Sequence, residues 1–228
     1  MADAQDNDSP LKPNETLDDT YLITEELGRG GIGVVYRAND RAREEDVAIK
    51  VLLPTWAADR KMVERFLREG RLAIRARHPN IVQVYAIGRR KGSGTPYFVM
   101  ELVEGETLLV RLKRARDRST TLGMASIHIG RQLLSALAAT HTKGIVHLKP
   151  GNIIIVKDDN AIGGESAKLL DFGIAKAIFT TGSDGTLTSA GDQQPGTPAY
   201  MPPEQFSALD KETDPTKMDV WALGVIFY

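Results

Sequence analysis

Cysteine is absent from the 228 residues of the chain, which excludes disulfide bonds and thiolate chemistry. Long apolar runs are also missing, so the sequence has no segment typical of a membrane span or a signal peptide. Neither sign of charge is in large excess, because 29 Lys and Arg face 30 Asp and Glu. This balance gives no reason to expect nucleic acid or a membrane surface as the main partner. The simplest expectation is a globular protein in the cytoplasm.

Acidic residues dominate the start of the chain. Residues 1–20 hold six carboxylates against a single base, Lys12, and few apolar side chains. A segment of this composition cannot bury enough apolar surface to offset the entropy lost on ordering. The sequence therefore predicts a disordered acidic tail over residues 1–20.

A glycine-rich loop, "GRGGIG" at residues 28–33, follows a strand-like pattern that begins at Tyr21. Glycines at this spacing let a backbone approach phosphate groups closely, because they carry no Cβ atom. Taken alone, such a loop is about as often a plain turn. Val34 and Val35 continue as a strand and not as a helix, so we expect a hairpin tip and not a dinucleotide-binding loop.

A lysine interrupts the apolar run "VAIKVL" at residues 47–52. By itself Lys50 is typical of an edge strand whose lysine reaches water. Farther along, "RKMVERFLREGRLAIRARHPNIV" predicts a helix in which Glu69 shares a face with Met62 and Phe66. A carboxylate in an apolar stripe needs a partner. A buried pair between Lys50 and Glu69 would explain both unusual positions.

These motifs together resemble the small lobe of a protein kinase, and "YFVMELVEGETL" resembles its last strand. The resemblance continues in family order through "GIVHLKPGN", "DFG", "GTPAYMPPEQ" and "DVWALGVIFY", and it covers residues 21–228. It implies an α+β, bilobal fold, with a β-rich small lobe and hinge over residues 21–103. A partial, mostly helical large lobe would occupy residues 104–228. Because family members continue beyond that last helix, the sequence indicates a fragment or a truncated gene model.

The same resemblance implies a site for ATP and Mg²⁺. Lys50 with Glu69, and Lys149 on the γ-phosphate, would carry the catalytic charges. Asn152 and Asp171 would supply the oxygen ligands that Mg²⁺ prefers. The residues implied in holding the nucleotide are Gly28, Gly30, Gly33, Val35, Ala48, Lys50, Met100, Glu101, Val103 and Ile154.

The implied substrate is a protein with a Ser or Thr hydroxyl, and no nucleic acid is implied. Thr197 in "GTPAYMPPEQ" resembles the peptide-positioning threonine of Ser/Thr kinases. Thr186 and Thr188, within the polar stretch 174–195, resemble a phosphorylated T-x-T pair of bacterial kinases, although an inert flexible loop has the same composition. A membrane anchor would have to lie in a C-terminal part outside this sequence.

The stretch "GIVHLKPGN" lacks a carboxylate where the family keeps one. The family reads His-Arg-Asp-Leu-Lys-Pro-x-Asn, whereas here Leu148 follows His147 directly. The natural alignment deletes Arg-Asp, which removes the acceptor of the substrate proton and roughly 7 Å of chain. In a second register His147 itself takes the Asp position and accepts the proton as a neutral imidazole, although Lys149 beside it disfavours the resulting cation.

Three hypotheses follow for this chain. The first is an active Ser/Thr protein kinase. The second is a pseudokinase that binds Mg-ATP and signals through its conformation. The third is a non-functional or mis-sequenced gene fragment.

Overall fold

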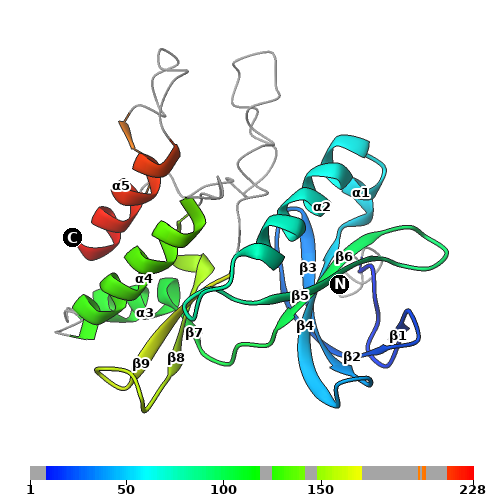
Figure 1. Cartoon of the computed structure of the whole chain (residues 1–228), viewed down its shortest axis with the longest axis horizontal. Coiled ribbons are helices and arrows are strands. Elements are labelled where there is room, and N and C mark those ends of the chain that lie inside the picture. The colour runs from blue at the N-terminus through cyan, green and yellow to red at the C-terminus, as the bar shows by residue number, and fades with distance from the viewer. Residues whose placement is uncertain (1–8, 119–124, 142–147, 171–199, 201, 204–214) are drawn as a thin grey trace. The chain divides into compact units, whose positions relative to one another are not determined.

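The computed structural model describes residues 9–118, 125–141, 148–170, 200, 202–203 and 215–228 (Figure 1). These residues belong to two compact units. Unit 1 comprises the chain up to Arg75 together with Gln83–Leu102. Unit 2 comprises Ala76–Val82 and the chain from Val103 onward.

Unit 1 is built on a six-stranded antiparallel sheet in the order β1-β2-β3-β4-β6-β5. Two helices connect β4 to β5, and Asp59 caps the longer one by accepting from the N–H of Lys61 at 2.8 Å. The elements are β1 (Thr16–Leu17), β2 (Tyr21–Arg29), β3 (Gly33–Asp40), β4 (Glu45–Leu52), α1 (Pro54–Ala57), α2 (Arg60–Arg75), β5 (Val84–Arg89) and β6 (Pro96–Glu101).

The register of β3, β4 and β6 sorts the side chains of unit 1 onto two faces. Lys50 lies opposite Val35 on one side and Phe98 on the other, and Ala48 lies opposite Met100. Directly paired residues share a face, as do alternate residues of one strand, so these five side chains lie on the same face. The other face carries core residues that are at most 1% exposed: Val34, Tyr36, Val47, Ile49, Val51 and Val99.

Helix α2 packs its apolar side against β5 and β6. The rings of Phe66 and Phe98 have centroids 4.7 Å apart, so this contact is made on the face of the sheet that carries Lys50. Gly70 permits the close approach, because a Cβ atom there would lie 3.0 Å from Ile87. The predicted helical face is confirmed at Met62 and Phe66, which are both buried.

The expectation of a disordered tail over residues 1–20 is wrong for residues 9–20, which we call the N-terminal strap. Leu11 and Leu17 are each 1% exposed and belong to the core on the opposite face of the sheet. β1 extends the sheet by pairing with β2. Two leucines are few, but each is placed where its whole side chain is removed from water.

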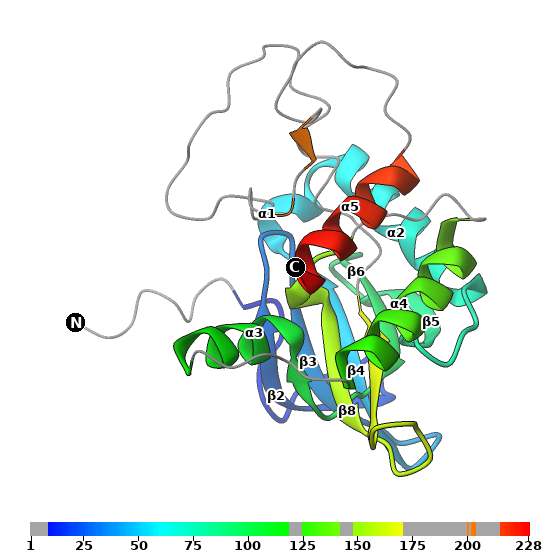
Figure 2. The same ribbon diagram turned by 90° about the vertical axis from the view of Figure 1, so that its left-hand side faces the viewer.

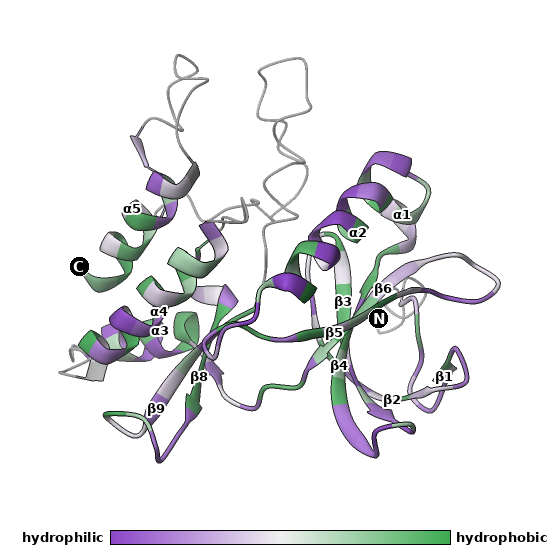
Figure 3. Cartoon of the chain, in the orientation of Figure 1, coloured by the Kyte–Doolittle hydropathy of each residue, from purple (hydrophilic) through white to green (hydrophobic). Residues whose placement is uncertain are grey.

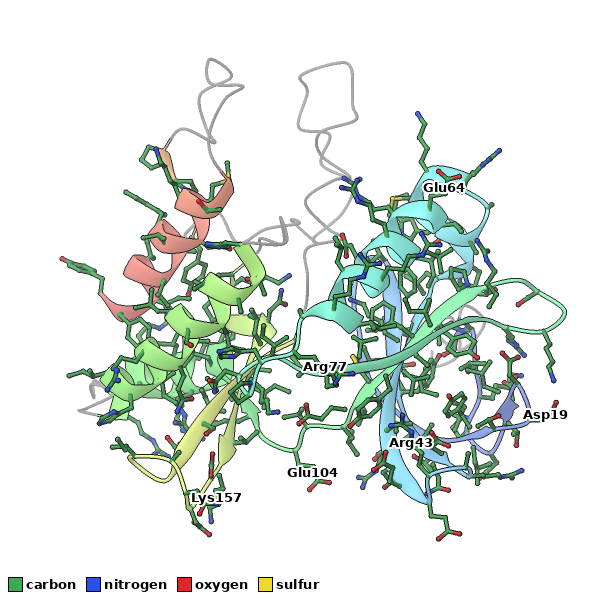
Figure 4. All side chains as sticks on the ribbon, in the orientation of Figure 1. Asp19, Arg43, Glu64, Arg77, Glu104 and Lys157 are labelled. Atoms are coloured by element: carbon green, nitrogen blue, oxygen red, sulfur yellow. The ribbon has the colours of Figure 1, made fainter. Side chains whose placement is uncertain are left out.

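The carboxylates of the strap bind partners on the β5–β6 hairpin. Arg90 forms an ion pair with Glu15. Lys91 does the same with Asp19 at 2.7 Å, and Tyr97 donates its hydroxyl to Asp18 at 2.7 Å (Figure 4 labels Asp19). Burial, together with the Asp18 carboxylate, raises the pKa of Tyr97, which keeps this hydroxyl protonated as a donor. The composition of the strap did not predict that it is ordered, because its partners lie about 70 residues away in sequence.

Unit 2 combines a three-stranded sheet, in the order β7-β8-β9, with helices (Figure 2 shows α3 lengthwise). Its core includes Leu133 of α4, Ile153 of β8 and Leu223 of α5. None of the helices among the described residues is both long and apolar enough to cross a membrane. The elements are β7 (Glu106–Thr107), α3 (Leu108–Asp117), α4 (Ala125–His141), the 3₁₀ helix η2 (Pro150–Asn152), β8 (Ile153–Lys157), β9 (Glu165–Leu169) and α5 (Pro215–Phe227).

Candidate nucleotide-binding site

The glycine loop forms the tip of the β2–β3 hairpin, as its sequence predicts. The N–H of Gly30 donates to the carbonyl of Gly33 at 2.9 Å, which closes the turn. A Cβ atom at Gly33 would lie 2.7 Å from the carbonyl oxygen of Val51, so β3 approaches β4 this closely only with glycine there. Gly28 and Gly30 are exposed. The loop therefore presents backbone with little side-chain cover.

Replacing Gly33 with alanine should destabilise unit 1, whereas the same change at Gly31 should not. The new methyl group at position 33 would collide with the backbone of β4, and overpacking of this kind costs about 1–3 kcal/mol. A Cβ atom at Gly31 would meet nothing within 4 Å. Urea denaturation of Gly33→Ala and Gly31→Ala measures the difference, and equal midpoints would contradict the close approach.

Lys50 lies on a central strand, because β4 is flanked by β3 and β6. The edge-strand interpretation of this lysine is therefore wrong. Its side chain is 9% exposed, and Nζ lies 5.8 Å from the centroid of the Phe98 ring. Favourable contact with an aromatic ring helps to hold an ammonium group out of water.

Glu69 projects from α2 beside Gly70 and is half-buried, with its Oε2 atom shielded from solvent. Phe98 connects the two elements, since its ring faces Lys50 on β4 and packs on Phe66 of α2. The fold of unit 1 thus brings the strand of Lys50 and the helix of Glu69 to the same face of the sheet. A direct pair between the two side chains stays a prediction.

Of the residues predicted to contact the nucleotide base, some belong to the sheet of unit 1 and one, Val103, belongs to unit 2. Ala48 and Met100 are buried and Val35 is half-buried, all on the Lys50 face of unit 1. Glu101 ends β6, and its backbone N–H donates to the Gln83 carbonyl at 2.9 Å. Val103 begins the second part of unit 2, outside any strand, and its backbone makes no hydrogen bond to another described residue.

Asn152 ends η2 in unit 2 and is 7% exposed. Its backbone is fixed on both sides, because its N–H donates to the Lys149 carbonyl at 2.9 Å and its carbonyl accepts from Leu170 at 2.8 Å. Leu170 is the residue before Asp171 in the sequence. The Nδ2 atom of Asn152 is buried without a hydrogen-bond partner among the described residues. A buried N–H donor left in this way costs about 1–3 kcal/mol, so a bound group that offers an acceptor oxygen to Nδ2 would fit the site.

Asp219 of α5 holds the loop that precedes Asn152, a role that sequence reasoning did not assign. Asp219 is 3% exposed, and its carboxylate accepts from the N–H of Leu148 at 2.8 Å and lies 2.9 Å from Nε2 of His141. Leu148 is the residue before which the family alignment predicts the missing Arg-Asp. An acidic residue at the start of the apolar segment "DVWALGVIFY" was the signal that could have revealed the anchor.

Two further predicted residues lie in the described part of unit 2. Lys149 is half-buried and extended just before η2. Ile154 is half-buried on β8, on the side opposite its buried neighbours Ile153 and Ile155. The predicted residues that lie outside the described part of the chain are His147, Asp171, Thr186, Thr188 and Thr197.

Comparison with known proteins decides the family. The model of the protein kinase domain matches residues 21–228. The chain belongs to the protein kinase family. This confirms the predicted resemblance and, with it, the α+β bilobal fold.

Its curated relatives include bacterial serine/threonine-protein kinases. The kinase domain is 37% identical over 218 residues to pkn3 of Myxococcus xanthus, with 94% of this chain and 38% of that protein covered. It is 39% identical over 220 residues to PknB of Mycolicibacterium smegmatis, with 93% and 32% covered. This chain therefore spans 38% and 32% of the length of these two relatives. A crystal structure of a double mutant of the PknI kinase domain of Mycobacterium tuberculosis matches with a TM-score of 0.66 and 26% identity, over 93% of this chain and 75% of that one.

Proposed function

We propose that this kinase domain binds ATP with Mg²⁺ and belongs to the class that transfers the γ-phosphoryl group to a Ser or Thr hydroxyl of a protein. The observation that carries the proposal is Lys50, a cation that is 9% exposed on a central strand. Charges interact more strongly in surroundings poor in water, so this ammonium acts on a bound phosphate far more than an exposed lysine would. The relatives named serine/threonine-protein kinases support the hydroxyl class.

The residues of unit 1 fit a nucleotide. Val35, Ala48 and Met100 offer apolar surface to the adenine ring on the same face as Lys50. Because Gly33 has no side chain, β3 can approach β4 closely at this point, beside Lys50. Glu69 would orient the ammonium group from α2. In this assignment Lys50 would bind the phosphates, with Glu69 holding the ammonium group in place.

The residues of unit 2 fit a metal ion, the γ-phosphate and the peptide substrate. The proposed ligands of Mg²⁺ are Asp171 and Oδ1 of Asn152. The unsatisfied Nδ2 atom of Asn152 is a hydrogen-bond donor, so it would meet a phosphate oxygen and not the ion. When bound, the ion would neutralise charge that develops on the phosphate oxygens. Val103 would offer to the adenine edge its backbone groups, to which no other described residue hydrogen-bonds. Lys149 would add a positive charge for the γ-phosphate, and Thr197 would position the peptide.

We further propose that transfer by this chain is very slow, so that it acts as a pseudokinase. Asp219 fixes Leu148, and Leu170 fixes Asn152, so the segment from Leu148 to Asn152 is anchored at both ends. This anchoring supports the family alignment from Leu148 onward, in which the missing Arg-Asp would fall directly before Leu148. Without that Asp the substrate hydroxyl has no carboxylate to take its proton.

ATP with Mg²⁺ should raise the melting temperature of the chain, because a ligand that binds only the folded state stabilises it by mass action, by about 2.7 kcal/mol at 100 times Kd. Lys50→Ala and Asp171→Ala should each shrink the shift, measured against the same variant without nucleotide. Arg41→Ala removes an exposed cation from unit 1 and should leave the shift unchanged. A full shift in Lys50→Ala would overturn the site assignment.

A further inference from the structure

Helix α2 exposes a row of cations, Lys61, Arg65, Arg68 and Arg71, which we call the basic stripe. Their spacing of four, three and three places them on one face of the helix. Arg65 is half-buried and the other three are exposed, on the side away from the buried face. Figure 3 shows hydrophilic colour along the outer turns of α2. The row spans ~15 Å of helix.

One carboxylate, Glu64, lies on the same face of α2 as the four cations of the basic stripe, so the stripe keeps an excess of positive charge. Its four side chains make no ion pair with a described residue, whereas their neighbour Arg60 pairs with Glu64 at 3.0 Å (Figure 4 labels Glu64). Asp59 at the start of α2 binds the backbone N–H of Lys61 and not its side chain.

The stripe opposes the stability of its own helix. Like charges three and four residues apart repel each other, as in the pair Lys61 and Arg65. The first turn of α2 contains no acidic residue, so its cations also oppose the helix dipole. Asp59 at the N-cap and Glu64 within the row offset only part of this repulsion, because the stripe alone holds four cations.

Two basic residues of α3, by contrast, have their charges neutralised by nearby carboxylates. Arg111 binds Glu165 at 2.7 Å and Glu106 at 2.9 Å, and Arg114 binds Glu106 at 2.7 Å. The Arg111 guanidinium lowers the pKa of the Glu165 carboxyl through its hydrogen bonds. Arg111 and Arg114 are therefore part of the structure of unit 2, whereas the cations of the stripe make no such pairs with described residues.

We propose that the basic stripe is a docking surface for an acidic segment of a partner polypeptide. Opposite charge at matching spacing supplies both attraction and orientation. The exposed large apolar side chains of the described residues all lie outside α2, so the stripe lacks the apolar groups with which interfacial helices enter a membrane. Among the exposed residues of α2 there is also no aromatic ring on which a nucleic-acid base could stack. Docking requires no nucleotide.

The test uses the whole chain and a fluorescein-labelled poly-glutamate peptide of about 12 residues, which as a helix would cover ~18 Å. Fluorescence anisotropy without nucleotide gives the affinity. The stripe variant replaces four cations with glutamine, which has similar helix propensity: Lys61→Gln, Arg65→Gln, Arg68→Gln and Arg71→Gln. The matched control removes the same charge from exposed positions of unit 2: Lys113→Gln, Arg118→Gln, Arg131→Gln and Lys217→Gln.

The stripe variant should bind the peptide at least about tenfold more weakly than the parent, while the control stays within about twofold. Its melting temperature should equal or exceed that of the parent, because repulsion along α2 is relieved. Equal losses in the two variants, or no binding by the parent, would overturn the proposal. Phosphatidylserine vesicles and single-stranded RNA are tested in parallel. Tighter, stripe-dependent binding to either of these would overturn it in favour of that class of partner.

Discussion

Insertion of Arg-Asp between His147 and Leu148 should raise phosphoryl transfer to a Ser/Thr protein substrate by about 10²–10⁴-fold, the range that positioned proton transfer contributes. The restored Asp would precede Leu148, whose N–H is already held by Asp219 at 2.8 Å. The inserted carboxylate would thus enter a loop whose following residues are in place. Transfer of radiolabelled phosphate to a generic Ser/Thr peptide, compared with the uninserted chain, measures the gain.

A second insertion separates loop length from the missing carboxylate. Arg-Asn restores the same length but supplies no proton acceptor, so it should recover far less activity than Arg-Asp. Equal activity of the uninserted chain and the Arg-Asp variant would show that the deletion is harmless. In that case His147→Ala should abolish transfer, because only the second register leaves His147 as the proton acceptor.

Truncation of the strap leucines should cost unit 1 much of its stability. Leu11→Ala and Leu17→Ala should each lower the free energy of unfolding by about 2–5 kcal/mol, because each removes a fully buried side chain and leaves a cavity. Both leucines are 1% exposed, whereas Leu27 on β2 is 47% exposed and serves as the matched control. Leu27→Ala should change the free energy of unfolding by no more than about 0.5 kcal/mol.

Urea denaturation monitored by tryptophan fluorescence gives these values, since Trp56 packs against the same core. A strap that only lies loosely on the surface would leave the midpoints of Leu11→Ala and Leu17→Ala unchanged. That result would contradict the buried position of the strap and restore the disordered-tail interpretation.

Local patterns predicted the parts of the site that local chemistry determines. The β-branched residues after the glycine loop favoured a hairpin, and the structure has its tip at Gly30–Ile32. The helical spacing of Met62, Phe66 and Glu69 predicted which face of α2 is buried. These features depend on a few neighbouring residues, so they can be predicted from a short stretch of sequence.

Features that depend on distant partners could not be predicted in the same way. Lys50 on β4 looks like an edge-strand lysine until β6, about 50 residues later, is known to pair beside it. The strap looks disordered until Arg90 and Lys91 are placed against its carboxylates. Asp219 anchors Leu148 from 71 residues away, so the acid in an apolar segment indicates a buried partner but not which residue that partner is.

The most direct test of the account is equilibrium dialysis of the chain against γ-labelled ATP with Mg²⁺, followed by separation of free nucleotide from labelled protein. The account predicts saturable binding that is lost in Lys50→Ala and kept in Arg41→Ala, with the label recovered as intact ATP. Absence of saturable binding, or equal binding by Lys50→Ala, would contradict the nucleotide site. Rapid appearance of the label on protein would contradict the assignment of a pseudokinase.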